Sequence, residues 1–216
     1  MCSSDLLDDY AAMCRAALML YETTGADAYV AQARRWVAVL DRYYWDSPAG
    51  GYFYTADDAD DIISRTKNAH DNATPSGNGM MVEVLARLHY LTGDDGYRTR
   101  AEALVAAFSG EVAKTAFPYA TLVMAASLLA RPIQLVIVGD RGDDATDALL
   151  RAAFGACTPR LIVSVLARDT TLPDGHPAAG KGMIDGRSTA YVCVGPTCSL
   201  PVTDPAALAA ELAKAA

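Results

Sequence analysis

The feature that most constrains the fold is an internal repeat. The segment LYETTGADAYVAQARRWVAVL (20–40) aligns with LHYLTGDDGYRTRAEALVAAF (88–108) at a constant offset of 68 residues, so that Gly25 matches Gly93. A fixed period of this kind means that one supersecondary unit is copied along the chain. We therefore expect similar units placed side by side.

Each unit is predicted to be a helical hairpin. The segment from about 5 to 23 is apolar on almost every side, which predicts an inner helix that is buried on most sides. The segment from about 27 to 44 is amphipathic, as an outer helix would be. Gly25 between them suits the left-handed conformation that ends a helix. The later segments of the same type are helices 78–91 and 95–110, and an inner helix 116–130 whose outer partner is missing.

Hairpins with inner and outer helices build a toroid when they stand side by side, and an up-down bundle is the alternative. The connection 45–77 between the units is too long to be passive. Its stretch from Gly50 to Thr55 alternates aromatic residues as a short hairpin strand would. Long loops at one end of a rigid scaffold often carry binding or catalytic residues.

After residue 131 the pattern changes. Strand 132–140, helix 143–154 and strand 160–166 form a βαβ unit, which predicts a short parallel sheet. A further strand is expected at 188–195, and a last helix at about 205–215. The predicted organisation is a helical-hairpin segment over 1–130 and a small α/β domain over 131–216.

The loop RTKNAHDNATPSGNGMM (65–81) carries polar residues typical of a ligand pocket. Arg65 and Lys67 supply positive charge, and Asp71 supplies a carboxylate. Ser76 and Asn78 lie at the start of an inner helix, where free backbone amides favour anions or polar ligand groups. Two structural alternatives stay open: Ser76 and Asn78 cap the helix, and the charged residues brace the loop.

A second carboxylate is expected beside Asp71. Under the repeat, Asp9 and Tyr10 correspond to Gly77 and Asn78, and therefore belong to the equivalent rim of the preceding helix. Paired carboxylates, one protonated and one ionised, are what glycoside chemistry needs. The alternative is that Asp9 only complements the dipole of its own helix.

Aromatic side chains near this loop could stack on a sugar ring. They are Tyr10, Trp45, Tyr52 and Phe53. The alternative is that these rings belong to the core, which is the commoner place for aromatics at helical and strand spacing.

No cofactor or metal motif is found. His70, His89 and His176 do not form a zinc-protease pattern, and VIVGDRGDDA is neither G-x-G-x-x-G nor a phosphate-binding loop. Cys193 and Cys198 form the closest cysteine pair; they could bind a metal or close a disulfide, and structural packing is favoured over both. We predict no metal and no cofactor.

Composition excludes several classes of protein. The net charge of −8 argues against a nucleic-acid partner. No apolar run reaches the length of a membrane span, and the first residues lack a signal peptide. Five unevenly spread cysteines do not suggest a secreted disulfide framework, so a cytoplasmic location is expected.

The order of several motifs resembles a known family. DDYAAMCRAALMLYETTG, WDSPAGGYFYT, RTKNAHDNATPSGN, LTGDDGYRTRAEAL, QLVIVGD and AYVCVGPTCSLPV are similar to the C-terminal half of the large thioredoxin-domain-containing proteins of the spermatogenesis-associated family. The resemblance implies a mainly α fold: part of an (α/α)6 toroid, like those of N-acylglucosamine 2-epimerases and six-hairpin glycosidases, then a small α/β domain. A thioredoxin-like domain would precede the toroid and is missing from this chain.

The resemblance leads to two functional hypotheses. The first is a carbohydrate-active domain, a sugar epimerase, isomerase or glycosidase-type site, in which Asp71 and Asp9 act on a small sugar-like ligand held by the neighbouring polar and aromatic residues. The second is a non-catalytic scaffold or redox-partner module for a thioredoxin-like domain. Where the family has Lys-Glu before the loop aspartate, this chain has Asn68 in place of Glu. Half a toroid exposes apolar helices, so a homodimer or misassembly is expected.

Overall fold

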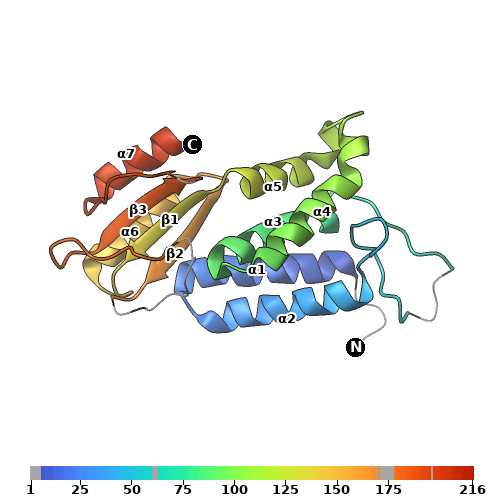
Figure 1. The fold of residues 1–216 in the computed structure, drawn as a ribbon, viewed down its shortest axis with the longest axis horizontal. Coiled ribbons are helices and arrows are strands. Elements are labelled where there is room, and N and C mark those ends of the chain that lie inside the picture. Colours follow the sequence, from blue (N-terminus) through green and yellow to red (C-terminus); the bar gives the residue numbers. More distant parts are fainter. Residues whose placement is uncertain (1–5, 60–62, 169, 171–177, 196) are drawn as a thin grey trace. The chain divides into compact units, whose positions relative to one another are not determined.

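The computed structural model is mainly helical and describes residues 6–59, 63–168, 170, 178–195 and 197–216 (Figure 1). Within these residues, the chain divides into two compact units. Unit 1 comprises Met1–His89 and Asp94–Leu129, and unit 2 comprises Tyr90–Gly93 and Ala130–Ala216.

Unit 1 is built from helices, as the repeat predicts. The first hairpin consists of α1 (Leu7–Thr24) and α2 (Asp27–Tyr43), and the second of α3 (Gly77–Thr92) and α4 (Asp95–Val112). A short 3-10 turn, η1 (Phe117–Tyr119), leads into α5 (Ala120–Ala130). Figure 1 shows α1 and α2 side by side along their length. The expected hairpin strand after α2 is reduced to a single bridge between Trp45 and Tyr52.

The two hairpin turns share their glycine conformation but differ in the cap of the second helix. Gly25 has φ 74° and Gly93 has φ 75°, so both glycines take the left-handed conformation that ends a helix. Asp94 caps α4 by accepting a hydrogen bond from the Gly96 amide at 2.9 Å. In the first hairpin Ala26 occupies the corresponding cap position, and Asp27 is already the first helical residue.

The inner helices α1, α3 and α5 run parallel to one another in a layer. Gly77, at the start of α3, faces Leu7 and Asp8 at the start of α1. Near the other end, the Arg87 guanidinium pairs with the Glu22 carboxylate at 2.6 Å.

On its other side α3 contacts α5. A Cβ added at Gly79 would lie 2.9 Å from the Thr121 methyl and 3.0 Å from the Leu122 amide nitrogen. α3 is therefore the central helix of the layer, with α1 and α5 at its two edges.

Burial differs sharply along this layer. In α3, nearly every residue from Gly77 to His89 is buried. The prediction that α1 is buried on most sides is wrong: Met13 is 52% exposed and Met19 is 50% exposed. The reason is its position at the edge of the layer, where no described helix covers this side.

Unit 2 contains a sheet with strand order β2-β1-β3-β4 in the described residues: β1 (Ile133–Val138), β2 (Leu161–Leu166), β3 (Thr189–Val194) and β4 (Thr197–Cys198). The pair β1 and β2 is parallel, and α6 (Asp144–Gly155) connects them. The prediction of a parallel sheet is wrong for β3, which pairs with β1 antiparallel. A parallel neighbour needs a crossover, and the described part of the connection from β2 to β3 contains no helix.

The sheet of unit 2 is covered differently on its two faces. Ile133, Leu135 and Ile137 join a core with the apolar sides of α6 and of α7 (Pro205–Ala215). Val136 and Val138 face the other way and pack around Ala178. Asp204 caps α7 by accepting a hydrogen bond from the Ala207 amide at 2.8 Å. Among the described residues, no helix combines the length and hydrophobicity needed to cross a membrane.

Candidate functional site

The candidate site surrounds the N-terminal end of α3, which the long loop after α2 approaches. Asn78 is 1% exposed and fixes this loop to the helix. Its side chain accepts a hydrogen bond from the Tyr52 amide at 2.9 Å and donates to the Tyr52 carbonyl at 2.9 Å. It also donates to the Asn68 carbonyl at 2.8 Å. The side-chain amide of Asn78 therefore holds the loop against the start of α3.

The cations of the loop are held by the loop itself. Lys67 pairs with Asp46 at 2.6 Å and also donates to the Gly50 carbonyl. The hydrogen bond from Lys67 lowers the pKa of Asp46. Arg65 donates to the Thr55 carbonyl at 3.0 Å, and its guanidinium stacks 4.1 Å from the centre of the Phe53 ring. Both cations therefore brace the loop in this structure.

Asp71 is half-buried and connects the loop to both neighbouring helices. One carboxylate oxygen accepts from the Ser76 amide at 2.9 Å, directly before α3. The other accepts from the Thr121 amide at 2.7 Å, in the first turn of α5. Burial acts to raise the pKa of Asp71, but the hydrogen bonds from Thr121 and Ser76 outweigh it, and the pKa lies below its usual value. Asp71 is therefore held in its ionised form.

A second carboxylate, Asp8, contacts the next amide along the chain. It accepts a hydrogen bond from the Gly77 backbone and is partly buried. Burial raises the pKa of Asp8, the Gly77 bond opposes this, and the negative charge of Asp9 raises the pKa further. A Cβ at Gly77 would clash with an Asp8 carboxylate oxygen, so a larger residue here would displace the Asp8 side chain. Asp8 and Asp71 thus bind consecutive amides while their pKa values shift in opposite directions.

Asp9 and Ser76 mainly serve their own helices. Asp9 is exposed and accepts a hydrogen bond from the Leu6 amide at 3.1 Å, which caps α1. Ser76 is 5% exposed, and its hydroxyl accepts from the Gly79 amide at 3.2 Å. The capping contact that was the structural alternative for Ser76 is therefore present, and Asp9 contacts the start of its own helix.

The aromatic residues of the candidate site contact other rings and cations. Tyr10 packs edge-on against Tyr44 with 5.8 Å between ring centres. Trp45 packs edge-on against Tyr52, and the Arg100 guanidinium lies 4.2 Å from the Trp45 ring centre. A ligand ring that stacked on Trp45 would have to use the ring face that Arg100 does not cover.

Sequence reasoning missed several residues of this site. Asp8 is not among the predicted site residues, because its contact with Gly77 joins two helices that lie far apart in the sequence. Tyr54 lies near Asp8 and Asp9: burial raises its pKa, and the charges of Asp8 and Asp9 raise it further. The pairing of Asp71 with Thr121 joins residues 50 positions apart and has no local signal.

The cysteines and histidines show no metal centre among the described residues. Cys193 and Cys198 form a disulfide between the paired strands β3 and β4, so the favoured expectation of structural packing alone is wrong for this pair. Burial raises the pKa of Cys14 to about 12, so this thiol is not a nucleophile at neutral pH. His176 lies outside the described residues.

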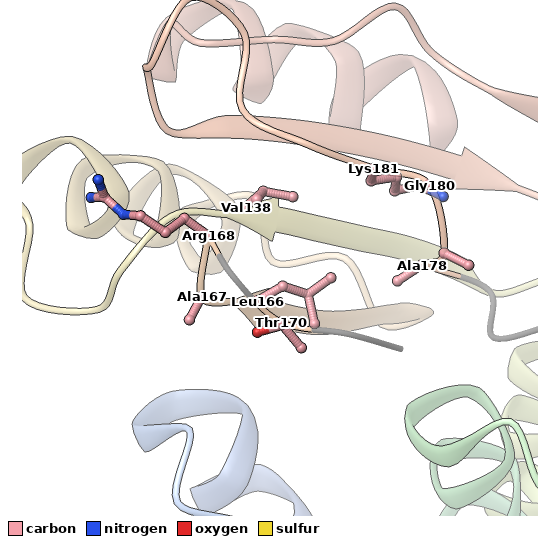
Figure 2. A pocket seen from close by; sticks show the side chains of 9 residues that line it. Val138, Leu166, Ala167, Arg168, Thr170, Ala178, Gly180 and Lys181 are labelled. Carbon is pink, nitrogen blue, oxygen red and sulfur yellow. The ribbon is translucent and has the colours of Figure 1, made fainter. Parts of the chain in front are cut away.

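Unit 2 holds a pocket of about 90 Å³ at the carboxyl ends of β1 and β2. Figure 2 shows Val138 and Leu166 on one side of it and Gly180 and Lys181 on the other. Drug-sized ligands occupy pockets of about 300–1,000 Å³. Arg168, which also lines the pocket, is paired with Asp140 at 2.7 Å. This pocket is therefore a weaker candidate than the α3 terminus.

Comparison with known proteins supports the family that the motifs indicate. The chain is 31% identical to human spermatogenesis-associated protein 20 over 214 residues, which cover 94% of this chain and 26% of the human protein. The rat protein of the same name is 31% identical and the mouse protein 29% identical over the same coverage. The chain thus spans about a quarter of the length of these relatives. No family model matches it.

Proposed function

We propose that unit 1 carries an acid–base site for a small polyhydroxylated ligand of the sugar type, at the N-terminal end of α3. The observation that carries the proposal is the pair of carboxylates on consecutive amides. The pKa of Asp8 is raised and that of Asp71 is lowered, so one carboxyl is biased towards protonation and the other towards ionisation. Oppositely shifted pairs of this kind divide the acid and base roles in glycosidases and related enzymes.

The proposed roles follow from these environments. Asp71, held ionised by backbone amides, acts as the base or as the stabiliser of developing positive charge. Asp8 donates the proton, and Asp9 assists by raising the pKa of Asp8 through its charge. Arg65, Lys67 and Asn78 act as positioning residues, because they hold the loop rather than a ligand. The exposed rim around the pair includes Asn68 and His70, which can contact ligand hydroxyls.

The same proposal includes a toroid. The parallel helices α1, α3 and α5, with α2 and α4 as hairpin partners, are what part of an (α/α)6 toroid would contain. A site at one end of the inner helices is where loops of such a scaffold converge. Because the chain spans about a quarter of the length of its relatives, any substrate or reaction of a longer protein is also a proposal.

The test is a thermal-shift titration with a panel of monosaccharides on three variants. We expect at least one sugar to raise the melting temperature of the wild type. The effect should be lost in Asp71→Asn and in Asp8→Asn, and retained in Asp27→Asn, which removes an exposed carboxylate from the first turn of α2. Any turnover should be highest at acidic pH, falling as Asp71 is protonated and as Asp8 is ionised.

A scaffold role is the second candidate, and a specific observation favours it. The side chains of Arg65, Lys67 and Asn78 are all bonded to backbone groups of the loop. A non-catalytic module that supports a thioredoxin-like partner domain needs this bracing and no ligand. If no sugar shifts the melting temperature, and Asp71→Asn changes only stability, the acid–base proposal fails and the scaffold is preferred.

A further inference from the structure

The side of α1 that no described element covers is a continuous apolar stripe. Met13 is 52% exposed, Met19 50% and Leu20 45%, and the nearby Ala12 and Ala16 are exposed too. These positions recur every three or four residues, so they share one face of the helix. Helical faces without a charge normally pack against another helix.

The repeat shows what this face does elsewhere in the same chain. Met13 and Leu20 correspond to Met81 and Leu88, both 0% exposed in α3. The residues of α3 that contact α1 include Gly77 and Arg87, whose counterparts in α1 belong to the exposed side. The exposed stripe of α1 is therefore equivalent to the side by which α3 receives the preceding inner helix.

The opposite edge of the layer offers a matching face. On α5, Val123 is 40% exposed and Met124 60% exposed, with Ala120 and Ser127 exposed on the same side. Phe117, just before the helix, is 91% exposed. This α5 stripe also contains no charged residue. By the order α1, α3, α5, it is the side on which the next inner helix of the layer would lie.

We propose that the α1 stripe (Ala12, Met13, Ala16, Met19, Leu20) packs against the α5 stripe (Phe117, Ala120, Val123, Met124, Ser127) of a second copy of this chain. The contact continues the parallel packing that already joins α1 to α3 and α3 to α5. Each copy offers one stripe of each kind, so two copies related by a two-fold axis satisfy both pairs of stripes. The proposal does not depend on the acid–base site.

Charge is compatible with this arrangement. Neither stripe carries a charged side chain, so no charge is buried without a partner. At the N-terminal end of the α1 stripe stands the exposed Asp9, and the exposed Lys114 lies in the segment that leads into α5. In a parallel contact the two opposite charges come to the same end of the interface. They favour the α1–α5 pairing over a parallel contact of α1 with α1, which would bring two Asp9 carboxylates closer.

The first test measures the mass of the complete chain by sedimentation equilibrium over a wide concentration range. We expect a dimer that dissociates on dilution. Ala16→Glu or Val123→Glu should raise the dimer dissociation constant by roughly 100-fold or more, because each buries an unpaired charge. The matched control Ala38→Glu, at an exposed alanine of α2, should leave it unchanged. Far-ultraviolet circular dichroism checks that each variant is folded.

Two outcomes overturn the proposal. The wild type could remain a monomer at every concentration, which would mean that the stripes are open to solvent or covered within one chain. Alternatively, Ala38→Glu could dissociate the dimer as strongly as Ala16→Glu, which would place the interface elsewhere.

The second test separates the α1–α5 contact from other dimers. In a background with Cys2→Ser and Cys157→Ser, chains with Ala16→Cys are mixed with chains with Val123→Cys and treated with a short bismaleimide. We expect cross-linked dimers in the mixture and none with either variant alone. Cross-linking of Ala16→Cys with itself would show that α1 pairs with α1, and would reject the proposal. The other free thiol among the described residues, Cys14, is buried.

Discussion

The helices α1 and α3 have the same place in the repeat but very different surroundings. The side of α3 that corresponds to the exposed stripe of α1 is covered, and Met81 and Leu88 have no exposed surface. Met13 and Leu20, their counterparts, are about half exposed at 52% and 45%. The comparison shows that an apolar pattern identifies the side of a helix that is suited to pack against another helix. Whether the neighbour is there depends on position in the layer.

The comparison extends to the charged residues between the helices. Arg87 is 5% exposed and bonds to Glu22 at 2.6 Å and to Glu83 at 2.9 Å, while Arg15 reaches Glu83 at 3.0 Å. The counterpart of Arg87 in α1 is Met19, at the free edge. A buried ion network thus joins α1 to α3. On the free side of α1, the equivalent position holds the uncharged Met19.

The largest expected effect breaks this network. Arg87→Met introduces into α3 the methionine that α1 has at the equivalent position, Met19. It removes the guanidinium that pairs with the nearly buried carboxylates of Glu22 and Glu83. Removing one partner of a buried pair costs about 3–5 kcal/mol, because the remaining charge stays desolvated. We expect urea unfolding to show a loss of this size. The reciprocal change, Met19→Arg, should cost less than about 0.5 kcal/mol in the monomer, as surface substitutions do. Equal losses of unfolding free energy for the two variants would contradict the position of α1 at the edge of the helix layer.

The next effect compares two methionines at the same repeat position. Met81→Ala empties a fully buried site and should cost about 2–5 kcal/mol. Met13→Ala removes a side chain that is 52% exposed, and we expect a loss below about 1 kcal/mol in dilute solution. The measurement is urea unfolding of both variants. A loss for Met13→Ala that grows with protein concentration would indicate that the stripe becomes covered by a second copy.

The sequence predicts the helices of unit 1 well for a physical reason. Apolar periodicity and the glycine turns are local, and the ends of α1 to α4 fall within a few residues of the expected ones. What the sequence could not predict is non-local. The direction of β3 depends on which strand it pairs with, and the exposure of α1 depends on which helices surround it. The toroid and the predicted division into domains 1–130 and 131–216 stay predictions.

For the candidate site, residue types were easier to predict than contacts. Polar residues before α3 indicate a region rich in side-chain contacts, since helix starts attract such residues. The partners of Asp71 and Lys67 could not be read from the sequence, because Thr121 and Asp46 come from distant segments. The roles of Asp71 and Asp9 in catalysis stay predictions, and Asp8 is added by the structure.

The smallest expected effect concerns the start of α3, where Asp71 of the loop and Asp8 of α1 accept hydrogen bonds from the Ser76 and Gly77 amides. Asp71→Asn keeps one acceptor oxygen but turns an amide group towards the second backbone N–H, so we expect a loss of about 1–3 kcal/mol at pH 7. The pKa of Asp71 is lowered in the folded state, so its stabilisation is present above the ordinary carboxyl value and is lost as pH falls through the lowered value. The difference from wild type should therefore shrink on acidification, as thermal unfolding between neutral and acidic pH would show.

Asp8→Asn is the matched control and should behave in the opposite way. The pKa of Asp8 is raised, so its charge opposes folding and stability is lost as pH rises through the raised value. The asparagine oxygen can still accept from the Gly77 amide. We expect Asp8→Asn to be as stable as wild type or more stable at pH 7, with the gain disappearing at acidic pH, where Asp8 is protonated. Equal destabilisation by both substitutions at pH 7 would show that the two carboxylates share one environment, and the division into acid and base would lose its support.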